Sequence, residues 1–130
     1  MNQQNFEKVF IVSNDPFWIA VLRQVLKLNG YEDVQAFNNS KDCIDNLYQQ
    51  PDLVLLNQTM DALSDLEMLS KIKQFGPDIN VLFISEQKNL EVALSSLKYG
   101  AFDYIIKGKN EAVKLRDVVR RLSAAKKLQG

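Results

Sequence analysis

Polar residues that could take part in chemistry follow four apolar runs of the sequence. Ser13 and Asn14 follow one run, Asn57 follows the most apolar run, and Ser85 and Lys107 follow two others. Their side chains supply hydroxyl groups, amide groups and one ammonium group. The sequence contains no histidine, no Gly-rich phosphate loop and no base beside Ser85 that could activate its hydroxyl, so nucleophilic catalysis of the usual kind is not indicated.

Each of the four runs has the length and composition of a buried β-strand. The runs are residues 9–12, 53–56, 81–84 and 102–106. The run before Asn57 holds four consecutive aliphatic residues behind a proline, which is typical of a central strand of a parallel sheet, buried on both faces. Because reacting groups collect at the carboxyl ends of such strands, we expect the polar residues to converge at one edge of the sheet.

Helical patterns separate these strands. Asp15 followed by Pro16 is typical of a helix start, since the Asp15 carboxylate can accept hydrogen bonds from backbone N–H groups of the next turn. Asn29-Gly30 is a suitable left-handed helix end, and Asn39-Ser40 opens a second helix. The inner faces are expected to hold Trp18, Leu22, Val25 and Leu26 in the first helix, Cys43, Ile44, Leu47 and Tyr48 in the second, Leu66, Leu69, Ile72 and Phe75 in the third, Leu90, Ala93, Leu94 and Leu97 in the fourth, and Leu115, Val118, Val119 and Leu122 in the fifth.

Strand and helix alternate five times along the chain, with the short second strand inside residues 31–37 and nearer a sheet edge. Parallel strands need crossover connections, and these are right-handed almost without exception. The predicted fold class is therefore α/β, a doubly wound (βα)5 three-layer sandwich with a parallel five-stranded sheet in the order 2-1-3-4-5. No repeat, low-complexity tract or linker interrupts it, so residues 1–130 are predicted to form a single domain.

The charge and composition narrow the classes of partner. The formal net charge is zero, which gives no general attraction to nucleic acid or to an anionic membrane. No stretch is long and apolar enough to span a bilayer and Cys43 is the single cysteine, so we expect a cytoplasmic protein without a disulfide, with Cys43 buried as a small apolar residue. Half of the sixteen basic residues lie near the end of the chain, between positions 107 and 127, either as a solvated helix face or as a contact for an acidic partner. They are Lys107, Lys109, Lys114, Arg116, Arg120, Arg121, Lys126 and Lys127.

The sequence resembles the receiver domain of response regulators, the CheY-like family of two-component signalling. The resemblance rests on the order of elements and on the stretches GYEDVQAF, PDLVLLNQTMD, VLFIS and YGAFDYIIK, and it extends from about residue 8 to about residue 122. It implies the flavodoxin/CheY-like fold. Family members carry an acidic pair after the first strand, a phosphoryl-accepting Asp after the third, a Thr or Ser after the fourth and a Lys after the fifth. By position these fall on Ser13 and Asn14, on Asn57, on Ser85 and on Lys107.

All three carboxylates of that pattern are replaced here. An Asn amide is a poor nucleophile, so Asn57 is not expected to accept a phosphoryl group. Magnesium is usually held by carboxylates together with waters and substrate oxygens, so Mg²⁺ binding is expected to be weak or absent, with no other cofactor. Asp15 is interpreted as a helix cap and Asp61 as a solvated loop residue. The resemblance therefore implies a degenerate receiver with no catalytic and no metal-binding residues, and not an enzyme.

The resemblance also implies the mode of action. Receiver domains contact partners through the surface of the fourth helix, fifth strand and fifth helix, where Tyr104 occupies the position of an aromatic switch residue. We expect protein partners on this face, with a homodimer as one form of that contact, and no direct contact with nucleic acid or membrane. Two alternatives stay open: a doubly wound domain whose strand-end pocket binds a small ligand, and a conventional phosphorylated receiver with an unexpected acceptor.

Overall fold

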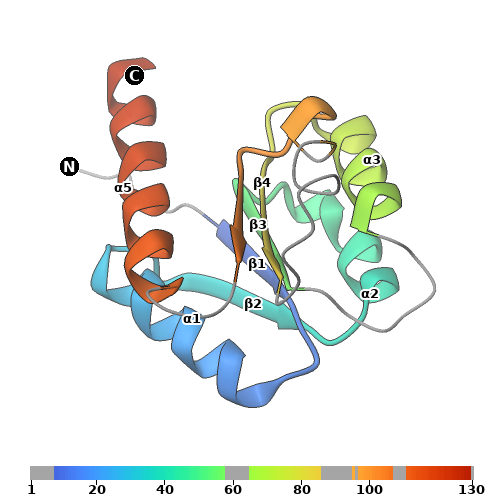
Figure 1. Ribbon diagram of the computed structural model, residues 1–130. Coiled ribbons are helices and arrows are strands. Elements are labelled where there is room, and N and C mark those ends of the chain that lie inside the picture. The colour runs from blue at the N-terminus through green and yellow to red at the C-terminus, as the bar shows by residue number, and fades with distance from the viewer. Residues whose placement is uncertain (1–7, 58–64, 86–94, 96, 107–110, 130) are drawn as a thin grey trace.

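Five short apolar runs form the strands of one parallel sheet (Figure 1). The computed structural model describes residues 8–57, 65–85, 95, 97–106 and 111–129. The strands are β1 (Lys8–Val12), β2 (Asp33–Phe37), β3 (Leu53–Asn57), β4 (Asn80–Ser85) and β5 (Asp103–Ile106). Their order is β2-β1-β3-β4-β5, and every neighbouring pair is parallel. The predicted fold class and strand order are confirmed, with β2 at an edge.

Helices cover both faces of the sheet. The helices α1 (Pro16–Leu28) and α5 (Glu111–Gln129) lie on one face, and α2 (Ser40–Asp45) and α3 (Asp65–Phe75) lie on the other (Figure 1). A short 3₁₀ helix, η1 (Leu47–Gln49), follows α2. None of the helices that the described residues form has the length and apolar character needed to cross a membrane.

The predicted helix ends are confirmed. Asp15 and Asn39 are the N-caps of α1 and α2, and the Asn39 side chain accepts a hydrogen bond from the backbone N–H of Asp42. At the end of α1, the N–H of Tyr31 donates to the carbonyl of Leu26 at 2.9 Å, and Gly30 adopts a φ of 92°. This is a Schellman motif, in which glycine tolerates the left-handed conformation that other residues resist.

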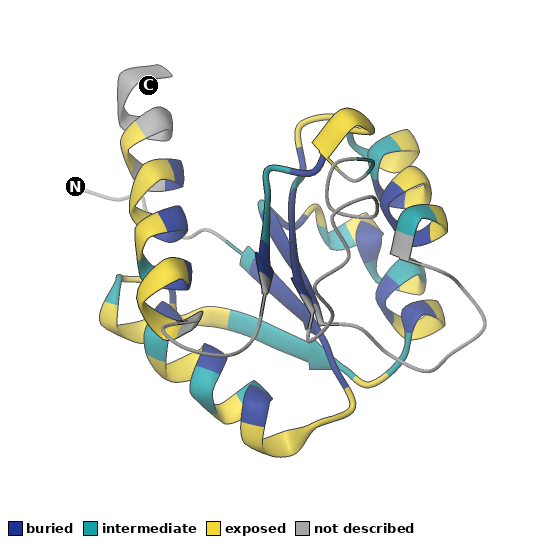
Figure 2. Ribbon diagram, in the orientation of Figure 1, coloured by how far each residue is buried: buried dark blue, intermediate teal, exposed yellow. Residues whose placement is uncertain are grey.

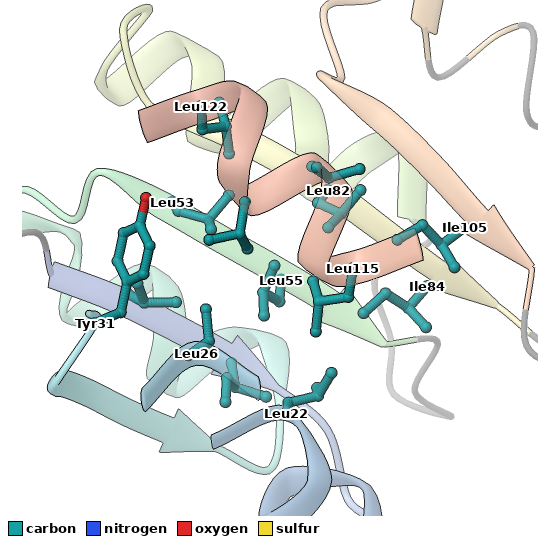
Figure 3. Close-up of a cluster of buried hydrophobic side chains, with 14 of the residues drawn as sticks. Leu22, Leu26, Tyr31, Leu53, Leu55, Leu82, Ile84, Ile105, Leu115 and Leu122 are labelled. Carbon is teal, nitrogen blue, oxygen red and sulfur yellow. The ribbon is translucent and has the colours of Figure 1, made fainter. Parts of the chain in front are cut away.

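Two hydrophobic clusters hold the layers together, one on each face of the sheet. Alternate residues of a strand point to opposite faces, so Val9 and Ile11 pack under α1 and α5, whereas Phe10 and Val12 pack under α2 and α3. Figure 2 shows the buried sides of the helices turned toward the sheet. Figure 3 shows the cluster under α1 and α5, where the predicted α5 stripe of Leu115, Val118, Val119 and Leu122 is buried as expected.

Three residues predicted to point inward are exposed instead. Tyr48, Phe75 and Leu97 are 69%, 52% and 44% exposed. Tyr48 lies in η1, where the change from α to 3₁₀ geometry rotates it away from the stripe begun by Cys43, and Phe75 is the last residue of α3. The buried Met68 of α3, beside Leu69, was not predicted. Leu90, Ala93 and Leu94 lie outside the described residues.

Cys43 is buried in the cluster under α2 and α3, as predicted. Its burial disfavours the charged thiolate and raises the pKa of the thiol from 9.0 to about 12. A thiol in this state is inert at neutral pH, because the thiolate is the nucleophilic form. Cys43 therefore acts as a small apolar core residue.

Candidate functional site at the carboxyl edge of the sheet

The strand register brings the ends of the central strands to one edge of the sheet. Val12 of β1 pairs with Leu56 of β3, and Asn57 pairs with Ile84 of β4. Ser85 in turn pairs with Ile106 of β5. The backbones of Ser13, Asn57 and Ser85 are therefore neighbours at this edge, as the sequence predicted. The side chains of Asn57 and Ser85, and the whole of Lys107, lie outside the described parts of the chain.

Ser13 takes part in the turn that joins β1 to α1. It is fully buried, and its backbone N–H donates to the carbonyl of Phe37 at 2.9 Å. Its Oγ accepts a hydrogen bond from the backbone N–H of Asp15 at 3.1 Å. The neighbouring Asn14 is exposed. A Ser hydroxyl that bonds to the backbone two residues later stabilises a turn, so Ser13 serves the local chain geometry.

Asp15 caps α1, which confirms its predicted role. Its Oδ1 accepts hydrogen bonds from the backbone N–H groups of Phe17 at 3.0 Å and Trp18 at 3.4 Å. These two N–H groups have no partner within the helix, and the negative charge also lies at the positive end of the helix dipole. The oxygen that accepts both bonds is therefore already used by the helix.

The donor set of the β1–α1 segment does not fit magnesium. Ser13 and Asn14 offer neutral oxygens, and Asp15 Oδ1 is directed at the first turn of α1. Magnesium demands near-octahedral oxygen coordination and is normally held by carboxylates. Within the described ranges, no group of three or more His, Cys, Asp or Glu side chains could hold a metal ion.

Asp103 and Tyr104 of β5 form a second polar arrangement, in which Asp103 contacts α5 and the Tyr104 ring packs on the opposite face of the sheet. The Tyr104 ring is half-buried and stacks on Phe83, with ring centroids 5.9 Å apart and an interplanar angle of 29°. The Tyr104 backbone N–H donates to Asp103 Oδ1 at 2.7 Å, and Asp103 Oδ2 accepts from Arg121 at 2.6 Å. The Arg121 guanidinium also lies 5.6 Å from the centroid of the Phe102 ring. Arg121 therefore links α5 to the edge of β5.

Sequence reasoning missed this link between Asp103 and Arg121. The two residues are 18 positions apart on different elements, so no helical or strand spacing connects them. An acidic residue on the outermost strand and a basic residue on the following helix were the only signals in the sequence.

A family model described as the response regulator receiver domain matches residues 9–120. Among curated proteins, the transcriptional regulatory protein ZraR of Klebsiella oxytoca is 32% identical over 100 residues, which are 76% of this chain and 22% of that protein. ZraR of Escherichia coli K12 is 31% identical over 108 residues, 82% of this chain and 24% of that protein. The chain spans about a quarter of the length of these curated relatives.

The fold is shared with solved receiver structures. A response regulator receiver domain protein from Clostridium thermocellum superposes with a TM-score of 0.83 at 23% identity, covering 96% of this chain and 100% of that one. The CheX-CheY complex with BeF₃ and Mg²⁺ from Borrelia burgdorferi contains a chain that matches with a TM-score of 0.78 at 24% identity, covering 89% of each chain. At these identities the likeness shows the fold.

Proposed function

Because the chain belongs to the response regulator receiver domain family, we propose that it is a receiver-like signalling module that acts through protein contacts without aspartyl phosphorylation. Receiver domains are signalling modules of two-component systems. The observation that supports a degenerate form is the set of residue types at the strand ends, with Ser13 and Asn14 after β1 and Asn57 at the end of β3. These positions correspond to the acidic pair and the phosphoryl acceptor of the family.

The chemistry of phosphoryl transfer supports this proposal. A carboxylate oxygen attacks the phosphoryl group, and a divalent cation neutralises the charge on the phosphoryl oxygens. The Asn57 amide lacks a nucleophilic oxygen of this kind. The β1–α1 segment adds no free pair of carboxylates for a cation, because Asp15 Oδ1 is already bonded to two backbone N–H groups. The nucleophilic attack and the binding of a divalent cation are therefore both weakened in this chain.

The conventional alternative needs another acceptor near the strand ends. Asp15 is the acidic residue of the described β1–α1 segment, and transfer to it would compete with its bonds to Phe17 and Trp18. Asp61 lies outside the described residues. Loss of both the acceptor and the acidic pair therefore favours a module that signals by changing its protein partner over a phosphorylated receiver.

The surface proposed to carry the signal combines the fourth helical segment, β5 and α5. The CheY of B. burgdorferi is solved with a partner protein, CheX, which supports protein contact as the mode of action. On this surface, Asp103 of β5 accepts hydrogen bonds from the backbone N–H of Tyr104 and from Arg121 of α5, so its carboxylate joins the two elements. We extend the proposal to a protein partner, or a second copy of the chain, on this face.

Intact-protein mass spectrometry after incubation with acetyl phosphate and Mg²⁺ tests the proposal. The chain is expected to gain no phosphoryl mass. A variant that carries Ser13→Asp, Asn14→Asp and Asn57→Asp is expected to be labelled, which would show that the scaffold still supports transfer. The matched variant with only Ser13→Asp and Asn14→Asp separates metal binding from the acceptor and should stay unlabelled. A stoichiometric adduct on the unchanged chain would refute the proposal.

A further inference from the structure

Three exposed aromatic side chains lie where helical elements end on one face of the sheet. Tyr48 in η1, Phe75 at the end of α3 and Tyr99 at the end of the fourth helical segment are 69%, 52% and 63% exposed. The crossover helices of a parallel sheet run antiparallel to its strands, so their ends lie at the amino edge of the sheet. The three rings are therefore at the edge opposite to the strand-end positions Ser13 and Asn57.

The elements that carry the rings lie side by side. Figure 1 shows α2, which leads into η1, beside α3, and the orange turn of residues 97–100 beside the end of α3. The stem of Lys73 in α3 passes close to this turn, since a Cβ added at Gly100 would lie 3.4 Å from Lys73 Cε. Lys73 Nζ also donates to the carbonyl of Ile79 at 2.6 Å and to that of Pro77 at 3.3 Å. Lys73 therefore joins the end of α3 to the chain segments that enter β4 and β5.

Side-chain hydrogen bonds hold η1 in the same row of elements. Gln49 Oε1 accepts from Gln35 of β2 at 2.7 Å and from Lys8 of β1 at 3.2 Å. Gln49 Nε2 donates to Asn46 Oδ1 at 3.0 Å. Tyr48 precedes Gln49, so its ring is carried by a segment that is anchored to two strands. An exposed ring on a rigid support loses little conformational entropy when it binds a partner.

Positive charge accompanies the rings. Residues 71–78 and 97–100 contain three basic residues, Lys71, Lys73 and Lys98, and one acidic residue, Asp78. Burial lowers the pKa of the Lys73 ammonium, and the negative charge of Asp78 acts in the opposite direction, so these two residues offset each other. Lys71 and Lys98 are exposed. They are the positive charges that this edge offers to a partner, which favours a partner with carboxylates.

The arrangement of the rings suits a particular backbone conformation in the partner. Neighbouring helices pack about 8–10 Å apart, so rings on adjacent helix ends recur at about that interval. A polyproline II helix has three residues per turn and rises about 3.1 Å per residue, so every third side chain lies on one side at intervals of about 9 Å. Proline-rich segments in this conformation dock on surfaces lined by aromatic side chains.

We propose that the helix-end rim, defined by Tyr48, Phe75, Tyr99, Lys71 and Lys98, binds a proline-rich, acidic segment of a partner protein in the polyproline II conformation. The rings contact every third residue of the segment, and the lysines pair with its Asp or Glu side chains. A second copy of the chain is disfavoured, because three partly exposed rings offer roughly a few hundred Å² of contact, whereas a stable protein interface needs about 800 Å² per partner. This inference rests on the proposed role as an interaction module and names a partner class for it, but it does not depend on the absence of phosphorylation.

A synthetic peptide tests the helix-end rim. The probe is a fluorescent peptide of about four Pro-Pro-Glu triplets, roughly 37 Å long, compared with a peptide in which Lys replaces every Glu. Fluorescence anisotropy with the full chain is expected to show saturable binding of the Glu peptide, weakened by salt, and no binding of the Lys peptide. A third peptide, in which Gly replaces every Pro, keeps the charge but not the preformed backbone and should bind more weakly. Failure of the Glu peptide to bind, or equal binding of the Glu and Lys peptides, would overturn the proposal.

Variants then locate the contact. Tyr48→Ala combined with Tyr99→Ala is expected to weaken binding of the Glu peptide by about tenfold or more, since exposed tyrosines often dominate the energy of such contacts. Lys71→Glu should also weaken it and reduce its salt dependence. Phe17→Ala is the matched control, because it removes a ring that is 75% exposed at the start of α1 on the other face of the sheet, and it should leave binding unchanged. Circular dichroism and thermal melting of each variant verify that it folds.

The outcomes separate this inference from the proposed function. Unchanged affinity in the Tyr48 and Tyr99 double variant, in a protein that is shown to fold, would overturn the site. Tighter binding of single-stranded nucleic acid, or self-association in sedimentation velocity, with the same dependence on the two tyrosines, would assign the rim to those ligands and refute the proposal. The peptide experiment contains no phosphoryl donor, so its failure leaves the mass-spectrometry result standing, and a phosphoryl adduct would leave the peptide result standing.

Discussion

The interior of the sheet and its carboxyl edge use their residues in different ways. In the interior, Phe10, Leu55 and Phe83 are almost completely buried and connect several elements. At the edge, the side-chain oxygens of Ser13 and Asp15 accept hydrogen bonds from backbone N–H groups two residues further along the chain. The interior therefore supplies the folding free energy, whereas the edge supplies local turns and caps. Because edge residues act locally, they can change type while the fold persists.

The largest expected effect comes from the interior. Phe83→Ala is expected to lower the free energy of unfolding by about 3–5 kcal/mol, because it leaves a cavity in the cluster under α2 and α3. It also removes the stacking partner of Tyr104. Urea unfolding followed by circular dichroism measures the change.

Phe75→Ala is the matched control for this substitution. Phe75 is 52% exposed at the end of α3, so its loss should change the free energy of unfolding by only about 0.5 kcal/mol. Similar losses for the two variants would contradict the assignment of Phe83 to the core and Phe75 to the surface.

The second effect depends on pH and concerns Cys43. The folded state keeps the thiol protonated up to about pH 12, whereas the unfolded chain releases this proton above pH 9.0. The folded state then binds more protons, so stability falls as pH rises from 9 to 12, by about 1.4 kcal/mol for each pH unit. Cys43 therefore adds this slope to the pH dependence of the unfolding free energy between pH 9 and pH 12.

Cys43→Ala isolates this contribution. The variant lacks the thiol, so its unfolding free energy should fall less steeply above pH 9 than that of the unchanged chain, while lysine titration contributes equally to both. The comparison uses the slope and is unaffected by a constant loss from the smaller side chain. Parallel pH curves would mean that Cys43 is accessible to solvent.

The sequence was sufficient to predict the elements that form the interior, because the physical signals for them are local. Four consecutive aliphatic residues before Asn57 indicated a strand covered on both faces, and β3 lies at the centre of the sheet. Asp15 and Asn39 indicated where two helices begin, because capping depends on residues within one turn of the helix start. Alternation and handedness indicated a parallel, doubly wound sheet, and the resemblance to receiver domains implied its strand order.

The surface and the site were less predictable. Helical spacing indicates which residues share a side of a helix, but it does not show where the helix ceases to pack on the sheet. Tyr48 and Phe75 were therefore wrongly predicted to be buried. The Asp103 and Arg121 link depends on how α5 packs against β5, which no local pattern encodes. The strand-end positions were foreseen from the strand limits, while the roles of Asn57, Ser85 and Lys107 stay predictions.

A smaller effect is expected at the carboxyl edge. Asp15→Ala should lower the free energy of unfolding by about 1 kcal/mol, because two backbone N–H groups of α1 lose their acceptor. Asp15→Asn keeps an acceptor oxygen and should cost much less. Thermal and urea unfolding of the two variants tests this. A loss as large as that of Phe83→Ala would break the distinction between edge and interior.

The smallest expected effect is none at all. Adding millimolar Mg²⁺ should leave the melting temperature unchanged, because a ligand stabilises a protein only by binding its folded state more tightly than its unfolded state. The described β1–α1 segment offers the hydroxyl of Ser13, the amide of Asn14 and a carboxylate engaged with α1. In family members, crowded carboxylates repel one another until a cation offsets them, and the proposed degenerate site would lack that repulsion. The variant with Ser13→Asp, Asn14→Asp and Asn57→Asp restores it, and Mg²⁺ should raise the melting temperature of that variant. A saturable rise in the unchanged chain would show that neutral oxygens suffice for a cation at this edge, and the edge would then retain a chemical role.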